Sequence, residues 1–250
     1  MKLETQVHGE AGDRPPLLIA HGLFGSARNW GAIARALSAR RQVVAVDMRN
    51  HGSSPWDERH DYVAMAEDLA GVIGGGRWDV LGHSMGGKAA MVLALTHPGT
   101  VTRLIVADIA PVAYGHSQAH LVEAMQALDL SAIATRADAD RALAASVDEP
   151  GVRAFLLQSL DVRERVWRLN LPVLGREMPK ILSFPEVAGR FDGPALFLTG
   201  SESRYVLPEH RDRILARFPN ARFETIDGAG HWLHAEKPHD FAAAVAGFLD

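Results

Sequence analysis

The chain has 250 residues, 47% of them hydrophobic and 22% charged, which suits one compact globular domain with a sizeable insertion. The formal net charge of -4 at pH 7 argues against a nucleic-acid partner, because such proteins carry a basic surface. Cysteine is absent, which excludes disulfides, a cysteine-rich zinc site and a thiol nucleophile. Residues 1–16 carry no apolar signal segment, and no apolar run approaches the roughly 20 residues of a membrane span, so we expect a cytoplasmic protein.

The first part of the chain alternates between short apolar runs and helical patterns. After a hairpin at residues 8–16, buried strands are predicted at Leu17–Gly22, Val43–Asp47, Asp79–Gly82 and Arg103–Asp108. Helices are predicted at Asn29–Arg40, at Asp61–Ile73 with Asp61 as N-cap, and directly after Ser84. The alternation resumes with strands at Ala195–Gly200 and Arg222–Ile226 and helices at Pro208–Phe218 and Lys237–Asp250. This order predicts an α/β fold with a mostly parallel sheet covered on both faces.

The pattern changes between residues 112 and 187, where helical segments follow one another and no strand is expected. We therefore expect residues 1–111 and 188–250 to form the core and residues 112–187 to form a helical cap. An insertion after a parallel strand lies at the carboxyl ends of the strands, where ligands bind in open α/β sheets. A lid over a ligand site is the functional interpretation, and an ordinary helical subdomain is the structural alternative.

The pentapeptide Gly82-His83-Ser84-Met85-Gly86 lies between a predicted strand and a helix rich in small residues. This arrangement is typical of the nucleophile elbow, in which a strained turn exposes a serine hydroxyl. The two glycines let the strand and the helix approach closely, and the helix directs its positive end toward the serine. The pentapeptide alone is weak evidence, but the strand before it and the helix after it predict that Ser84 is a nucleophile.

A serine hydroxyl needs a base, and His231 is the candidate. It follows the last predicted strand in a loop with glycines at 228 and 230, which matches the chain order serine, acid, histidine. His83 should point away from Ser84, and His234 should face packing or solvent. A metal site of His231, His234 and His239 lacks a partner at any known spacing, so we expect neither a metal nor a cofactor.

The acid that orients the histidine has two candidates. Its usual place, three residues beyond Gly200, holds Ser203, with Glu202 one position early. The other place is the end of the preceding strand, where Asp108 stands. A carboxylate at the end of a buried strand is costly unless it is paired, so we favour Asp108 over Glu202. A helix cap or loop anchor is the structural alternative for Asp108.

The oxyanion of the reaction must be bound by backbone N–H groups. One is expected from Met85, directly after the nucleophile. The other is expected from the turn His21–Gly25, with Leu23 as the first choice and Phe24 as the second. The remaining polar side chains near these turns are expected to brace them; they are His21, Asp47, Arg49 and His51.

Five stretches of this sequence resemble the YbfF-like acyl esterases of the α/β-hydrolase superfamily. They are "HGLFGSARNW", "VDMRNHGSSP", "GHSMGGKAAM", "ADIAPVAY" and the cap segment "FLLQSL…WRLNLPVL". The resemblance covers nearly the whole chain and implies a Ser–Asp–His carboxylesterase, with the roles carried by Ser84, Asp108 and His231. It also implies acyl esters, and thioesters such as acyl-CoA, as substrates. Lys88 and Arg49 would then either meet an anionic part of the substrate or brace the fold.

The sequence thus predicts a cofactor-free serine carboxylesterase acting on small to medium acyl esters. The expected pocket is apolar and roofed by the cap, with walls from Phe24, Phe155, Leu156 and Trp232. Serine at position 84 argues against haloalkane dehalogenase and epoxide hydrolase chemistry, which use aspartate. Thioesterase, C–C bond hydrolase and cofactor-free haloperoxidase-like activities stay open, as does a small-molecule receptor on the same fold. Natural substrate, acyl length, cap mobility and oligomeric state stay open too.

Overall fold

A computed structural model describes all residues from 1 to 250. Its centre is a seven-stranded sheet in the order β1-β3-β2-β4-β5-β8-β9. All neighbouring strands are parallel except β1 and β3. The strands are β1 (Thr5–His8), β2 (Leu17–Ala20), β3 (Val43–Val46), β4 (Trp78–His83), β5 (Val101–Ala107), β8 (Ala195–Gly200) and β9 (Ala221–Ile226). The predicted mostly parallel sheet is confirmed.

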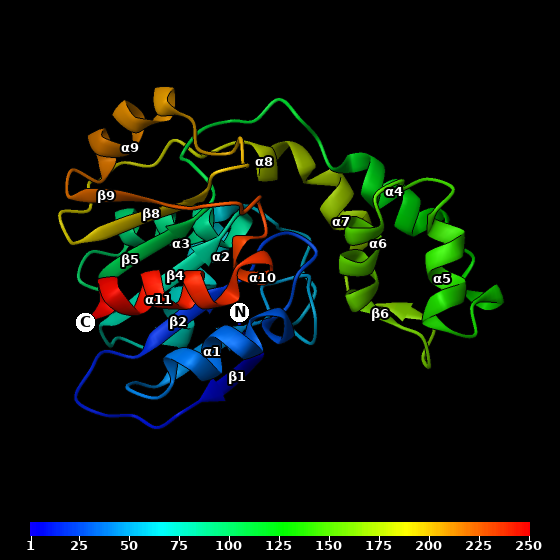
Figure 1. Cartoon of the computed structure of the whole chain (residues 1–250), viewed down its shortest axis with the longest axis horizontal. Coiled ribbons are helices and arrows are strands. Elements are labelled where there is room, and N and C mark those ends of the chain that lie inside the picture. Colours follow the sequence, from blue (N-terminus) through cyan, green and yellow to red (C-terminus); the bar gives the residue numbers. More distant parts are fainter.

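Helices cover both faces of this sheet (Figure 1). One face carries α2 (Tyr62–Ile73), α3 (Met85–Thr96) and α9 (Arg211–Arg217), and the other carries α1 (Gly31–Leu37), α10 (Leu233–Glu236) and α11 (Pro238–Leu249). Short 3-10 turns precede α1 at Ala27–Trp30 and α9 at Pro208–His210. The central strands are apolar at successive positions because each face has its own core.

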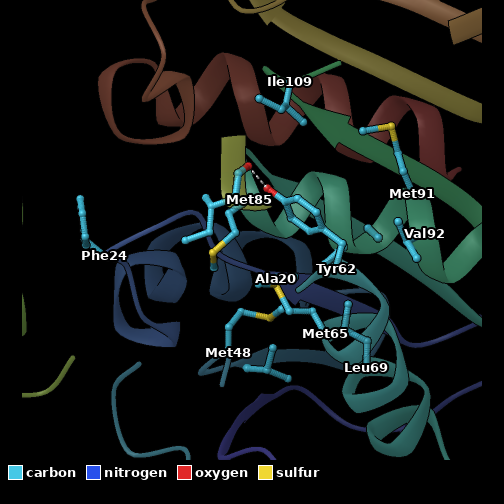
Figure 2. Packing of buried hydrophobic residues seen from close by; sticks show 14 of the residues in the cluster. Ala20, Phe24, Met48, Tyr62, Met65, Leu69, Met85, Met91, Val92 and Ile109 are labelled. Carbon is cyan, nitrogen blue, oxygen red and sulfur yellow. Dashed lines mark hydrogen bonds between the residues drawn. The ribbon is translucent and has the colours of Figure 1, made fainter. Parts of the chain in front are cut away.

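The helix α3 is the most enclosed element of the fold. Every residue from Met85 to Leu95 is buried, and the small side chains on this helix let it lie close to the sheet. Figure 2 shows Met91 and Val92 of α3 in the same apolar cluster as Tyr62 and Met65 of α2. The start of α3, directly after Ser84, is therefore held in place by packed structure.

The chain between β5 and β8, called the insertion below, is mostly helical and lies beside one end of the sheet (Figure 1). Its elements are α4 (Ala119–Ala127), η2 (Leu130–Ala132), α5 (Arg136–Leu143), α6 (Pro150–Leu156), η3 (Leu157–Ser159), β6 (Leu160–Asp161), β7 (Val166–Trp167), α7 (Leu171–Arg176) and α8 (Met178–Leu182). The expectation that it holds no strand is wrong, because β6 and β7 pair as an antiparallel hairpin. Two-residue strands are too short to give a sequence pattern.

Polar contacts join this insertion to the loop after β3 and to α3. The Gly52 N–H donates to the Arg168 carbonyl at 2.8 Å and the Asn170 N–H to the Asn50 carbonyl at 3.0 Å. Farther along, Lys88 Nζ donates to the carbonyls of Leu182 and Ser183, at the end of α8. The insertion also shares the larger apolar cluster with α2 and α3. It is therefore docked on the core by both apolar and polar contacts.

Lys88 and Arg49 brace the fold in this structure. Lys88 is buried, its ammonium lies 4.7 Å from the Tyr114 ring centroid, and burial lowers its pKa to about 7. Arg49 is also buried, and its Nε lies 2.6 Å from Asp68 Oδ2. Neither side chain lines the cavity beside Ser84. Of the two alternatives that the sequence left open, the geometry supports bracing.

Three local expectations have different outcomes. Asp61 caps α2, since its carboxylate accepts the Ala64 N–H at 2.8 Å, as predicted. The helix predicted at Asn29–Arg40 is longer than the observed α1, which covers only Gly31–Leu37. Residues 8–16 do not form a hairpin, because β1 pairs with β3 rather than with β2.

In the whole structure, no helix combines the length and the apolar character that crossing a bilayer demands.

Candidate active site

Ser84 occupies a tight turn between β4 and α3. Its φ of 52° is in the left-handed region, which L residues other than glycine rarely adopt. A Cβ on Gly82 would lie 2.2 Å from the Gly86 carbonyl oxygen, and one on Gly86 would lie 2.3 Å from the Ala20 carbonyl oxygen. Both positions therefore need glycine, for the reason that the sequence suggested. The turn leaves the serine hydroxyl at the carboxyl end of the sheet.

Three side chains from distant parts of the chain form a hydrogen-bonded relay. His231 Nε2 lies 3.0 Å from Ser84 Oγ, and His231 Nδ1 lies 2.7 Å from Asp108 Oδ2. A carboxylate only accepts, so Nδ1 carries the proton and Nε2 is left to accept from the serine hydroxyl. The structure thus brings Ser84, His231 and Asp108 together in the order that general-base activation of a serine requires.

Asp108 lies at the end of β5 and is fully buried. Besides His231, its carboxylate accepts the Gly200 N–H at 3.3 Å and a short hydrogen bond from the Ser203 hydroxyl. These donors compensate for the burial of the charge. Glu202 is exposed, and only its backbone N–H is engaged, by the Ala229 carbonyl. Of the two acid candidates, only Asp108 contacts the histidine.

The loop that carries His231 is held from two sides. Nε2 of the buried His83 donates to the His231 carbonyl at 2.8 Å. Burial and the neighbouring His234 and His231 hold the pKa of His83 well below its usual value, so the ring is neutral. On the other side, the Tyr205 ring stacks on the His231 imidazole, with centroids 3.8 Å apart and an angle of 18° between the planes. A stacked aromatic ring favours the imidazolium that forms during proton transfer.

Two backbone N–H groups are available for an oxyanion. Met85 is the first residue of α3, so its N–H has no acceptor within the helix. Leu23 lines the same cavity as Ser84, and its N–H meets no protein acceptor. The N–H of Phe24, the second choice from sequence, donates to His51 Nε2 at 3.1 Å. The geometry therefore favours Leu23 over Phe24.

The four predicted bracing side chains lie around these turns. His21 Nε2 accepts the Met48 N–H at 2.9 Å, and Asp47 accepts the Ala27 N–H at 2.8 Å. His51 holds Phe24, and Arg49 pairs with Asp68 as described above. Burial lowers the pKa of His21 to about 4, and burial together with the neighbouring His21 ring lowers the pKa of His51 to about 3. Both rings are neutral acceptors at physiological pH.

A cavity of about 60 Å³ opens at Ser84 between the sheet and the insertion. Phe24, Phe155, Leu156 and Trp232, the four walls expected from sequence, all line it. Other residues of the core and of the insertion also line the cavity, and some of them are polar; they include Leu121, Val152, Asn29 and Gln118. His234 borders the cavity but is stacked on Trp30, with centroids 4.2 Å apart, so it packs as expected.

Sequence reasoning missed several contacts of this site. Ser203 stands in the usual acid position, but nothing in the sequence indicates that its hydroxyl donates to Asp108. Tyr205 and Ser159 gave no signal, because stacking on His231 and the 2.8 Å hydrogen bond from Ser159 Oγ to the Phe24 carbonyl are tertiary contacts. The hydrogen bond from His83 to the His231 backbone also gave no sequence signal, although His83 is adjacent to Ser84 in the chain.

Comparison with known proteins shows the family of the chain. Residues 17–244 match the model of the alpha/beta hydrolase family, so the chain belongs to this family. It is 40% identical to "Esterase YbfF" of Escherichia coli over 100% of this chain and 99% of that protein. It is 42% identical to the mouse "sn-1-specific diacylglycerol lipase ABHD11" over 94% of this chain and 81% of that protein.

A solved structure titled "Marine microorganism esterase" superposes on the chain with a TM-score of 0.94 and 37% identity, covering 99% of each chain. The resemblance to YbfF-like esterases is thereby confirmed. Together with the esterase and lipase relatives, the fold identifies the protein as an ester-hydrolysing serine hydrolase.

Proposed function

We propose that the protein hydrolyses small to medium acyl esters through an acyl-enzyme at Ser84, with His231 as the base and Asp108 as the acid partner. The observation that carries the proposal is the unbroken relay of 3.0 Å and 2.7 Å from the Ser84 hydroxyl through the imidazole to a buried carboxylate. A receptor on the same fold would not need this alignment.

The relay defines the proton movements. Ser84 Oγ attacks the ester carbonyl carbon while His231 Nε2 takes the hydroxyl proton. The tetrahedral intermediate then collapses, and the leaving alkoxide takes that proton from Nε2. A water molecule then attacks the acyl-enzyme and gives one proton to His231 Nε2. As the second tetrahedral intermediate collapses, Ser84 Oγ takes that proton and the carboxylic acid is released. Asp108 keeps the Nδ1 proton in place and stabilises the imidazolium throughout.

In this scheme the N–H groups of Leu23 and Met85 bind the negative oxygen of both tetrahedral intermediates. Phe24, Phe155, Leu156 and Trp232 contact the acyl or alcohol part of the substrate. Residues 112–187 act as a lid, because α6 supplies two of these walls and the core the other two. A cytoplasmic location stays a prediction, which cell fractionation would test.

The surface around the site suggests dissolved rather than aggregated substrates. None of the most exposed large apolar side chains lines the cavity; they are Met1, Val7, Trp56, Val63, Val166 and Leu215. Lipases that work on lipid aggregates need a continuous apolar patch to adhere to them. This distribution favours soluble esters of short and medium acyl length.

The nucleophile is tested with Ser84→Ala. We expect kcat for a short p-nitrophenyl ester to fall by about 10⁶ and labelling by a fluorophosphonate probe to vanish. Ser131→Ala is the matched control, because Ser131 is an exposed serine of the insertion that bonds only Asp129. Hydrolysis that survives in Ser84→Ala would refute the mechanism.

The substrate class is tested with a chain-length series. We expect kcat/KM to be highest for soluble oxygen esters of short or medium acyl length and to fall for emulsified long-chain esters. The same acyl groups presented as CoA thioesters decide between the ester and thioester alternatives. A maximum at long-chain emulsions would contradict the proposed substrate class.

A further inference from the structure

The turn that carries Leu23 is held in a strained form. The Gly25 N–H donates to the Gly22 carbonyl at 3.0 Å, which closes a four-residue turn. Phe24, the third residue, has a φ of 63°, whereas Leu23 is not in the left-handed region. This is the type II pattern, whose third position favours glycine. A phenylalanine there costs free energy, so other contacts must keep it in place.

The core supplies one of these contacts. His51 Nδ1 donates to the Arg49 carbonyl at 2.9 Å, which fixes the tautomer and leaves Nε2 free to accept. Nε2 accepts the Phe24 N–H at 3.1 Å. Phe24 could reach a relaxed, negative φ only if the peptide between Leu23 and Phe24 rotated. That rotation would take the N–H away from His51, so His51 holds the peptide on one side of Phe24.

The insertion supplies the other contact. Ser159, at the end of η3, donates its hydroxyl to the Phe24 carbonyl at 2.8 Å, and both groups are buried. The neighbouring Gln158 accepts a hydrogen bond from Asn29, which follows the turn. The peptide on the second side of Phe24 is therefore held by a residue of the insertion, 135 positions away in the chain.

The turn also abuts the nucleophile. A Cβ built on Gly22 would lie 3.2 Å from Ser84 Cβ, so the turn begins in contact with the residue that it serves. A small change of the turn would shift the Leu23 N–H relative to the oxygen that Ser84 creates. Hydrogen bonds to a developing oxyanion lose strength rapidly when their donors are misplaced.

We propose that Ser159 and His51 are positioning residues for the oxyanion hole: they clamp Phe24 and thereby present the Leu23 N–H, so that the hole is complete only while the insertion is seated. The inference rests on the proposed esterase mechanism. It adds that the insertion takes part in transition-state binding as well as in enclosing the substrate. Ser159 acts through Phe24 and does not touch the substrate.

The test is Ser159→Ala, with kcat and KM measured for a soluble p-nitrophenyl ester. We expect kcat to fall about tenfold and KM to stay within about twofold, because only the transition state carries the oxyanion. Complete loss of one oxyanion donor costs about 10²–10³. Affinity for a trifluoromethyl ketone, whose adduct with Ser84 bears an oxyanion, should fall in parallel. Ser131→Ala, the same change on the surface of the insertion, should leave all three values unchanged.

A second background separates positioning from general loosening. Glycine at position 24 adopts a positive φ without strain, so Phe24→Gly should hold the turn without the clamp. We expect Ser159→Ala to lower kcat by no more than about twofold when added to Phe24→Gly.

Equal effects of Ser159→Ala in both backgrounds, a change confined to KM, or no effect at all would overturn the positioning role. None of these results would touch the proposed function, which is tested separately by Ser84→Ala and by the chain-length series.

Discussion

Asp108 accepts hydrogen bonds from the His231 ring, the Ser203 hydroxyl and the Gly200 backbone while it is fully buried. Its φ of 53° suits aspartate and asparagine, so Asp108→Asn should preserve the backbone. The amide removes the charge and favours the wrong histidine tautomer, so we expect kcat to fall by roughly 10⁴. Glu202→Gln, the same change on the exposed neighbouring carboxylate, should leave kcat within about twofold. The reverse pair of results would move the acid to the later loop.

Ser203 offers a second test at this scale, because its hydroxyl already touches the Asp108 carboxylate. Asp108→Gly keeps the positive φ and vacates the carboxylate position. Adding Ser203→Asp should place a new carboxylate near His231 Nδ1 and raise kcat at least about tenfold above that of Asp108→Gly alone. A double variant no faster than Asp108→Gly would show that the loop cannot supply the acid.

Chain order and local context were enough to select Ser84, Asp108 and His231, which the structure brings into hydrogen-bond distance; their catalytic roles stay predictions. The desolvation of a strand-end carboxylate was the useful signal for Asp108, because Glu202 proves to be exposed. Contacts such as those of Tyr205 could not be predicted. They depend on where a loop passes in space, and no local pattern encodes that.

Among the elements, α3 and α11 each contain a glycine that offers a controlled comparison. A Cβ on Gly86 would meet the β2 backbone at 2.3 Å, whereas a Cβ on Gly247 has nothing within 4 Å. Backbone cannot move aside as a side chain can, so Gly86→Ala should lower the free energy of unfolding by about 1–3 kcal/mol or more. Gly247→Ala, within the helix α11, should raise it by about 0.5–1 kcal/mol.

Denaturant unfolding of both variants measures these changes, and ester hydrolysis measures their effect on the elbow. We expect Gly86→Ala to lose activity as well as stability, because the clash lies two residues from Ser84. Gly247→Ala should retain wild-type kcat. Equal stability of the two variants would mean that β2 and α3 are not pressed together as the structure shows.

Element existence was predictable and element ends were less so. Strands such as β8 stand out because their buried, apolar runs are bounded by turn residues, and the predicted range Ala195–Gly200 is the observed one. The pairing of β1 was not predictable, because a four-residue edge strand can pair with either neighbour and tertiary contacts decide which. The hairpin of β6 and β7 is too short to carry a periodic pattern.

Over the whole molecule, burial removes the charge from a set of histidines. The pKa values of five of them lie below the usual value, chiefly because of burial; they are His21, His51, His60, His83 and His234. Several serve as neutral hydrogen-bond partners in the turns around Ser84. The arrangement that positions the site therefore also makes the fold sensitive to acid.

The sign of this sensitivity follows from proton linkage. Below pH 6.5 the unfolded chain protonates these histidines and the folded chain does not, so the free energy of unfolding falls as the pH falls. Each contributes up to about 1.4 kcal/mol per pH unit between 6.5 and its folded pKa. For His234, that folded pKa is about 3 because of burial and the neighbouring His231.

We expect His234→Phe, which keeps a ring against Trp30 but cannot be protonated, to flatten this dependence. Between pH 7 and pH 5, the free energy of unfolding of the variant should fall by about 1–2 kcal/mol less than that of wild type. His239→Gln, at an exposed position, should run parallel to wild type. Urea unfolding at both pH values gives the comparison. Parallel curves for His234→Phe and wild type would mean that His234 takes up its proton in the folded protein, and acid sensitivity would then have to arise elsewhere.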